Sequence, residues 1–267
     1  MSATESTPSP PLTGQHAFVT GGGKGIGAAI AAELVRLGAD VTIAARDTDA
    51  LAQQQEVLTA IAGNTQVAIQ PLDITDAEAT QAAFAAAAAS LGSPQILINN
   101  AGIAPSLAID KMDDATWTRS FAVNVDGPMR LMRQAIPAMR EAGYGRIVSV
   151  ASTAALRGYP MVSCYVAAKH ALLGLTRSVA LELARTAITV NAVCPGYTDT
   201  EMAAGAVRNL VKAGKSEAEA RKLLSRGNPQ GRLVQPEEVA QAVGWLCLPG
   251  ASAVTGQAIA VAGGEVM

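Results

Sequence analysis

The sequence predicts an α/β protein with a Rossmann-type, doubly wound parallel sheet and a short helical substrate lid. Short apolar runs, typical of buried strands, alternate with segments of helical spacing along the whole chain. A glycine-rich turn, 20–27, joins the first apolar run to the first helix, as in a βαβ phosphate site. Polar residues follow the ends of several apolar runs, where sheets of this kind bind their ligands.

The elements follow in a regular order. The predicted strands are 17–19, 40–45, 67–69, 96–98, 146–150, 188–193 and 258–261. The predicted helices are 28–35, 47–62, 76–91, 114–140, 163–184, 200–213, 216–226 and one that starts at 236. Asp76 is expected to cap the third of these helices, and Pro236 to begin the last.

Two regions are expected along the chain. Residues 1–14 contain Ser, Thr and Pro, lack the basic and apolar parts of a secretory signal, and are predicted to be a disordered tail. Residues 15–267 are predicted to form a single dinucleotide-binding catalytic domain, with the lid at about 199–228. The length of 267 residues and the hydrophobic content of 49% suit one large core.

Charge and composition exclude several classes of function. A net charge of −2 and a pI of about 5.7 argue against nucleic acid as the main partner. The three cysteines are widely spaced, which favours free thiols in a reducing compartment, and we expect a cytoplasmic protein. Two histidines are too few for a histidine-based metal site. The longest uncharged stretch, 79–109, is interrupted by glycine, proline and asparagine, so no membrane segment is predicted.

The glycine turn predicts a phosphate site. Glycines allow the backbone to approach an anion closely, and the N-terminus of the following helix supplies free N–H donors and a partial positive charge. The expected contact residues in this turn are Gly21, Gly23, Lys24, Gly25, Ile26 and Gly27.

The end of the second strand bears on which dinucleotide binds. An NAD enzyme commonly has an acidic residue there to bind the ribose hydroxyls, whereas this strand ends in Ala45 and is followed by Arg46. Arg46 and Lys24 can together hold a 2′-phosphate. Asp47 comes one place later and is a candidate helix cap. NADP(H) is therefore favoured, with NAD(H) as the alternative.

Three side chains suggest proton chemistry. Tyr165 and Lys169 are four residues apart on a predicted helix and share one face, and Ser152 follows a strand end. A phenol protonates a forming alkoxide only if its pKa, about 10 in isolation, is lowered. We expect the Lys169 ammonium and an oxidised nicotinamide to lower it, and Ser152 to donate a hydrogen bond to the carbonyl oxygen. Asn124 is expected to hold a water that links Lys169 to solvent.

Taken together, these motifs resemble the short-chain dehydrogenase/reductase family over nearly the whole chain, from about 15 to 266. The matching segments are TGGGKGIG (20–27), NNAG (99–102), Asn124, the serine of VAS (150–152), YVAAK (165–169) and PGYTDT (195–200). The resemblance implies a catalytic tetrad of Asn124, Ser152, Tyr165 and Lys169, with Tyr165 as the general acid in reduction, and a homotetramer. It implies further cofactor contacts at Asp73, Ile74, Asn100, Ala101, Gly102, Tyr165, Lys169, Pro195, Gly196, Thr198 and Thr200.

The substrate is expected to be a small carbonyl or alcohol compound. Segments 181–196 and 231–240 are similar to ketoacyl and polyketide ketoreductases, which favours a 3-oxoacyl thioester or another β-keto compound. Between 205 and 227 the lid carries six basic residues against two acidic ones, which suits an anionic carrier but equally a solvated helix pair. Cys164, beside Tyr165, is interpreted as a buried inert thiol rather than a pocket residue.

Other functions remain as alternatives. The nearest is an NAD-dependent alcohol or 3-hydroxyacyl dehydrogenase that works in the oxidative direction. A non-catalytic dinucleotide sensor has no need of both Tyr165 and Lys169. An epimerase or dehydratase of the family's extended branch needs a larger C-terminal domain than the residues after Pro195 provide. The family's dehalogenases lack a cofactor motif, whereas this chain has the complete glycine turn and Lys169.

Overall fold

A computed structural model describes residues 9–267, which fold around a seven-stranded parallel sheet. The strand order is β3-β2-β1-β4-β5-β6-β7, so the connection reverses direction between β1 and β4. The strands are β1 His16–Thr20, β2 Asp40–Ala45, β3 Val67–Pro71, β4 Ile96–Asn99, β5 Gly145–Val150, β6 Ile188–Pro195 and β7 Ala258–Val261. The predicted doubly wound fold is confirmed.

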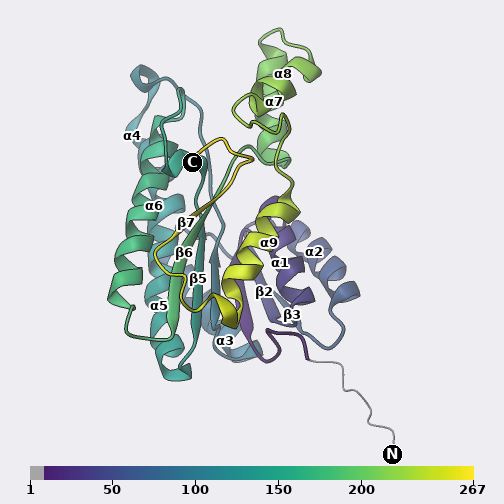
Figure 1. Cartoon of the computed structure of the whole chain (residues 1–267), viewed down its shortest axis with the longest axis vertical. Helices are drawn as coiled ribbons and strands as arrows, with labels where there is room; N and C mark the ends of the chain where they lie inside the picture. Colours follow the sequence, from purple (N-terminus) through teal and green to yellow (C-terminus); the bar gives the residue numbers. More distant parts are fainter. Residues whose placement is uncertain (1–8) are drawn as a thin grey trace, which may run out of the picture.

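Helices cover both faces of the sheet (Figure 1). The α-helices are α1 Gly25–Arg36, α2 Thr48–Ile61, α3 Ala77–Leu91, α4 Asp114–Phe121, α5 Gly127–Ala142, α6 Ser163–Glu182, α7 Glu201–Lys212, α8 Glu217–Ser225 and α9 Pro236–Cys247. On one face α1, α2 and α9 pack against the strands through aliphatic side chains such as Leu34, Leu51 and Val243. On the other face α3, α5 and α6 do so, with Phe84 and Leu131 among the buried residues.

The stretch predicted as one helix over 114–140 is divided. A π-helical turn, Ala122–Asp126, separates α4 from α5, and Gly127 follows it. Single π turns inside helices widen the backbone locally and are frequent at functional sites. Here the wide turn contains Asn124, whose side chain is fully buried.

Helix caps agree with the local sequence signals. The Asp47 carboxylate accepts a hydrogen bond from the Ala50 amide at the start of α2, and Asp76 accepts from the Glu78 and Ala79 amides at the start of α3. Asp47 is therefore a cap, as its position suggested, and the expected cap at Asp76 is confirmed.

The predicted disordered tail, residues 1–14, extends too far toward the C-terminus. Residues 1–8 lie outside the described structure, but 9–14 are placed, and Leu12 is 0% exposed. The Leu12 amide donates to the Leu37 carbonyl, and Pro10 lies against Gly38. Burial of one leucine beside the end of α1 therefore orders a turn that its composition assigned to the tail.

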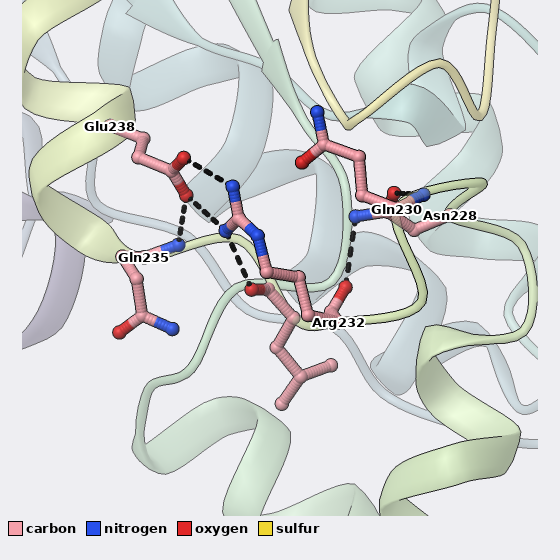
Figure 2. Close-up of polar contacts among 6 residues, drawn as sticks. Asn228, Gln230, Arg232, Gln235 and Glu238 are labelled. Carbon is pink, nitrogen blue, oxygen red and sulfur yellow. Dashed lines mark hydrogen bonds and ion pairs between the residues drawn. The ribbon is translucent and has the colours of Figure 1, made fainter.

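The carboxyl ends of the strands meet at one end of the sheet, the end at which α7 and α8 and the C-terminus also lie (Figure 1). The segment that returns from α8 to the body of the protein is fixed by Arg232, whose guanidinium makes two 2.6 Å contacts with the Glu238 carboxylate at the start of α9 (Figure 2). Glu238 also accepts from the Gln235 amide, so the segment after α8 is connected by polar contacts to the start of α9. Among the described residues, no helix has both the length and the apolar character needed to cross a membrane.

Candidate active site

A cleft of about 740 Å³ opens above the carboxyl ends of the strands. It extends from the glycine turn, past the ends of β4, β5 and β6, to the lid helix α7. Predicted site residues that line it are Gly21, Lys24, Gly25, Ile26, Asn100, Ala101, Gly102, Ser152, Tyr165, Lys169, Pro195, Gly196, Thr198 and Thr200. The fold therefore brings together residues that are up to 179 positions apart in the chain.

The glycine turn has no space for larger residues. A Cβ on Gly27 would collide with the Gly21 carbonyl oxygen and the Asn100 amide group, and a Cβ on Gly21 would lie 2.8 Å from the same Asn100 side chain. Gly21 and Gly25 also have positive φ angles of 65° and 55°, which glycine adopts without strain. This close packing leaves the N-terminus of α1 facing the cleft with its free amides.

Thr20 joins the glycine turn to the next strand, a role that the sequence did not indicate. Its hydroxyl lies 3.0 Å from the Asn100 amide and 3.1 Å from the Ala101 amide, both of which donate to it. The Asn100 side chain in turn donates to the Thr20 and Gly21 carbonyls. The NNAG segment is thus held against the glycine turn by hydrogen bonds in both directions.

A second cleft of about 350 Å³ lies beside the end of β2 and contains the groups expected to select the dinucleotide. Predicted cofactor residues that line it include Gly23, Lys24, Arg46, Asp73 and Ile74. Lys24 Nζ forms an exposed ion pair with Asp47 at 2.6 Å. Hydrogen bonds from Thr75 hold the pKa of Asp73 below its usual value, and the charge of Arg46 adds to this effect.

Ser152 and Tyr165 meet at the floor of the main cleft. The Ser152 hydroxyl oxygen accepts from the Ala154 amide at 3.0 Å, so its proton is available to another acceptor. Burial raises the pKa of Tyr165, and hydrogen bonding to Ser152 lowers it to a smaller extent. The phenol therefore keeps its proton at neutral pH.

Lys169 lies behind Tyr165 and is only 3% exposed. Its ammonium donates to the Val150 carbonyl at 2.8 Å and lies 5.6 Å from the centre of the Tyr165 ring. Burial lowers the pKa of Lys169 to about 8. Lys169 is not among the groups that shift the pKa of Tyr165 here, where burial has the largest effect. The expectation that the ammonium and an oxidised nicotinamide together lower this pKa stays a prediction.

Asn124 faces the same place from the π-helical turn. Its side-chain amide donates to the Ser120 and Ile103 carbonyls, while its Oδ1 accepts from the Ile103 amide at 3.3 Å. A Cβ on Gly102 would lie 2.9 Å from Asn124 Oδ1 and 3.5 Å from Lys169 Nζ. A side chain at position 102 would therefore occupy space beside both groups, and the small size of Gly102 leaves that space open.

The loop after β6 closes the cleft on the side of the lid. The Thr198 hydroxyl donates to the Gly196 carbonyl, and the Thr200 hydroxyl donates to the Thr198 carbonyl. Thr200 also lies against Gly25, since a Cβ built on Gly25 would be 3.2 Å from the methyl group of Thr200. Hence this loop contacts the glycine turn directly.

The basic lid is partly neutralised. Arg208 pairs with Glu201 at 2.6 Å, and Arg221 pairs with Asp199 and Glu217. Arg208 and Lys212 line the main cleft, whereas the other four lid cations do not. Glu201, the partner of Arg208, lines the same cleft, so at the α7 side of the opening Lys212 is the lining cation without an ion pair among the described residues.

Two further residues escaped sequence reasoning. Tyr159 lines the cleft, and its hydroxyl contacts Glu265, 106 residues away. No local pattern marks either residue. Cys164 is fully buried, as are the other two cysteines, which agrees with its interpretation as an inert thiol.

Comparison with known proteins places these features in context. A family model described as enoyl-(acyl carrier protein) reductase matches residues 21–265. The 3-oxoacyl-(acyl-carrier-protein) reductase FabG of Pseudomonas aeruginosa is 39% identical over 256 residues, which is 96% of this chain and 99% of that protein. The cis-4-hydroxycyclohexanecarboxylate dehydrogenase of Sinomonas cyclohexanicum is 38% identical over 251 residues, covering 93% and 95%. A crystal structure of an actinorhodin polyketide ketoreductase variant with NADPH superposes with a TM-score of 0.89 at 37% identity, covering 94% of this chain and 97% of that one.

Proposed function

The chain belongs to the short-chain dehydrogenase/reductase family of oxidoreductases, and we propose that it uses NADPH to reduce a ketone to a secondary alcohol. The observation that supports this most strongly is the convergence of Ser152, Tyr165 and Lys169 on one cleft that continues to the glycine turn. We assign Tyr165 as the general acid and Asn124, Ser152 and Lys169 as its partners.

The residues of the two clefts fit a dinucleotide. The glycine turn lines the main cleft at Gly21, Gly25 and Ile26 and opens into α1, so its backbone amides can approach a pyrophosphate. The second cleft would take the adenosine part, with Asp73 and Ile74 beside the adenine. Gly102, Pro195, Gly196, Thr198 and Thr200 would enclose the nicotinamide part. When bound, NADPH supplies a hydride.

The side chains of Tyr165 and its neighbours would supply the proton that the carbonyl oxygen receives. Tyr165 is in its acid form at neutral pH, which is the form that ketone reduction consumes. Burial makes it a weaker acid, so we propose that the Lys169 ammonium and the oxidised nicotinamide together lower its pKa once the cofactor is bound. Ser152, oriented by the Ala154 amide, donates a hydrogen bond to the carbonyl oxygen as negative charge develops there. Lys169 and Asn124 stand behind Tyr165, and we propose that a water between them passes protons from solvent after each turnover.

NADPH is favoured over NADH by the residues at the end of β2. Arg46 is exposed at the second cleft and forms no ion pair with the described carboxylates, so its guanidinium can bind a 2′-phosphate. Lys24 is already paired with Asp47, so we expect it to contribute less than Arg46. The NADPH of the actinorhodin ketoreductase structure supports the same preference.

The substrate is proposed to be a β-keto compound such as a 3-oxoacyl thioester. The family includes both the FabG reductase and the cyclohexanecarboxylate dehydrogenase named above. Their nearly equal sequence identity to this chain does not decide between their substrates. The position of Lys212 at the cleft favours an acyl group attached to an anionic carrier, with residues 199–228 as the lid over it. A homotetramer is the arrangement we propose for the assembly.

Oxidation of NADPH in the presence of a panel of ketones, β-ketoesters and acetoacetyl-CoA tests the proposal. NADH in parallel, and NADP⁺ or NAD⁺ with the matching alcohols, distinguish reduction from the oxidative alternative. Turnover of a β-keto substrate with NADPH supports the assignment. Tight binding of NADPH without its oxidation by any member of the panel would contradict it and would favour a sensor.

A further inference from the structure

The carboxylate of Glu265, near the C-terminus, is held between three segments that border the cleft. These are the loop that carries Tyr159, the loop at Gly196 after β6, and the end of the lid at Gly227. Figure 1 shows the C-terminus at the same end of the sheet as α7 and α8. The Glu265 side chain therefore contacts the loop of Tyr159, the loop after β6 and the end of the lid.

The hydrogen bonds around Tyr159 have a definite direction. The Tyr159 oxygen lies 2.6 Å from Glu265 Oε1 and 2.7 Å from the Thr153 hydroxyl oxygen. A phenol has one proton and a carboxylate only accepts, so Tyr159 donates to Glu265 and the Thr153 hydroxyl donates to Tyr159. Burial and the bond to Glu265 raise the pKa of Tyr159 to about 12, which keeps this proton in place. Thr153 follows Ser152, so the chain of bonds begins next to a catalytic residue.

The two glycines show how closely the carboxylate is packed. A Cβ on Gly196 would lie 2.9 Å from Glu265 Oε2, and a Cβ on Gly227 would lie 2.8 Å from Oε1. The carboxylate is therefore packed closely against both glycines, and a Cβ at either position would displace it. Arg157 adds a further restraint, since its guanidinium stacks on the Tyr159 ring at 4.7 Å. Glu265 consequently sets the distance between Tyr159, on one side of the cleft, and the end of the lid at Gly227.

We propose that Glu265 is a positioning residue that sets the substrate-binding shape of the cleft through Tyr159 and the end of the lid; this inference rests on the proposed ketone reduction. Because the Tyr159 hydroxyl is committed to Glu265 and Thr153, its ring alone is presented to the cleft that it lines. The part of the substrate that meets Tyr159 is therefore apolar. Glu265 acts on the affinity for the ketone and not on the proton transfer.

Steady-state kinetics of four variants test this role. Glu265→Ala removes the acceptor, Glu265→Gln keeps an oxygen acceptor of the same shape, Tyr159→Phe removes the donor, and the fourth variant combines Glu265→Ala with Tyr159→Phe. Glu56→Ala, an exposed carboxylate on α2, is the matched control. We expect Glu265→Ala to raise KM for the ketone about tenfold with a smaller change in kcat, and Glu265→Gln to restore most of the loss.

The double variant shows whether Glu265 acts through Tyr159. We expect its KM to equal that of Glu265→Ala, because the two single changes remove the same bond. Multiplication of the two single effects, equal loss in the Gln and Ala variants, or a fall in kcat with KM unchanged would each overturn the proposal.

Hydrogen–deuterium exchange of the NADPH-mixed protein separates this test from that of the function itself. Glu265→Ala should increase exchange in residues 199–228, whereas Glu265→Gln and Glu56→Ala should not. Unchanged exchange in the alanine variant would contradict the positioning role even if every ketone were reduced. An increase confined to the alanine variant would support it even if no ketone in the panel were turned over.

Discussion

Replacement of Lys169 by methionine should abolish turnover and yet stabilise the folded protein at neutral pH. The Lys169 ammonium is buried without a carboxylate partner, and burial lowers its pKa from 10.5 to about 8. Each pKa unit corresponds to about 1.4 kcal/mol, so the charged form is roughly 3 kcal/mol less stable in the folded state than in the unfolded chain. Methionine is of similar length and apolar, but it leaves the Val150 carbonyl without this donor, a loss of about 1–2 kcal/mol. The expected net gain is about 1–2 kcal/mol.

The pH dependence of this gain distinguishes it from better packing. Below pH 8 Lys169 is charged in both states, and the wild-type protein carries the full penalty. Between pH 8 and 10.5 the folded state has released the proton and the unfolded state still holds it, so the stability of the wild type rises with pH. The wild type regains about 2.5 kcal/mol between pH 7 and pH 10, so the advantage of Lys169→Met should be largest at pH 7 and should be lost, and slightly reversed, at pH 10.

Urea denaturation at pH 7, 8.5 and 10, with a fixed protomer concentration, measures the difference. Lys111→Met, at a lysine whose side chain is 74% exposed, is the control and should show no such trend. A Lys169→Met protein that is less stable than wild type at pH 7, or a difference that does not change with pH, would refute the assignment of Lys169 as an uncompensated buried cation.

Two further predictions concern specificity. Arg46→Asp should shift the ratio of kcat/KM for NADPH over NADH by about 10- to 100-fold towards NADH, through loss of charge-assisted bonds to the 2′-phosphate; an unchanged ratio would show that Arg46 does not bind it. Lys212→Ala should raise KM for acetoacetyl-CoA about two- to fivefold while leaving KM for an uncharged ketone unchanged, since exposed charges contribute little each. Lys215→Ala, outside the cleft, is the control. An equal effect from both lysines would show that the lid does not bind the carrier through the charge of Lys212.

Features encoded by neighbouring residues were predictable from the sequence. The apolar runs predicted each of the seven strands, and Asp47 and Asp76 cap helices because their carboxylates reach amides two or three residues away. The glycine turn was predicted from its place between a strand and a helix, and the structure adds that Gly21 and Gly27 pack too closely for a Cβ on Gly27. Such signals are short-range, and tertiary packing did not override them.

Features that depend on distant contacts were not predictable. The π-helical turn at Asn124 accompanies hydrogen bonds to Ile103, and the burial of Leu12 depends on the end of α1. The contact between Tyr159 and Glu265 spans 106 residues without a pattern to mark it. The spacing of Tyr165 and Lys169 placed them on one face, but it gave neither the depth of their burial nor the direction of the ammonium. The expected fall in the pKa of Tyr165 depends on Lys169 and an oxidised nicotinamide together, and burial of the phenol opposes it to an extent that the spacing did not indicate.

The rate of hydride transfer in a single turnover of Tyr165→Phe tests the central claim most directly. If Tyr165 supplies the proton that the carbonyl oxygen receives, removal of its hydroxyl should slow NADPH oxidation about 10²–10⁴-fold while NADPH still binds with its normal affinity. A variant that oxidises NADPH with a ketone at a rate close to that of the wild type would show that the proton comes from another group.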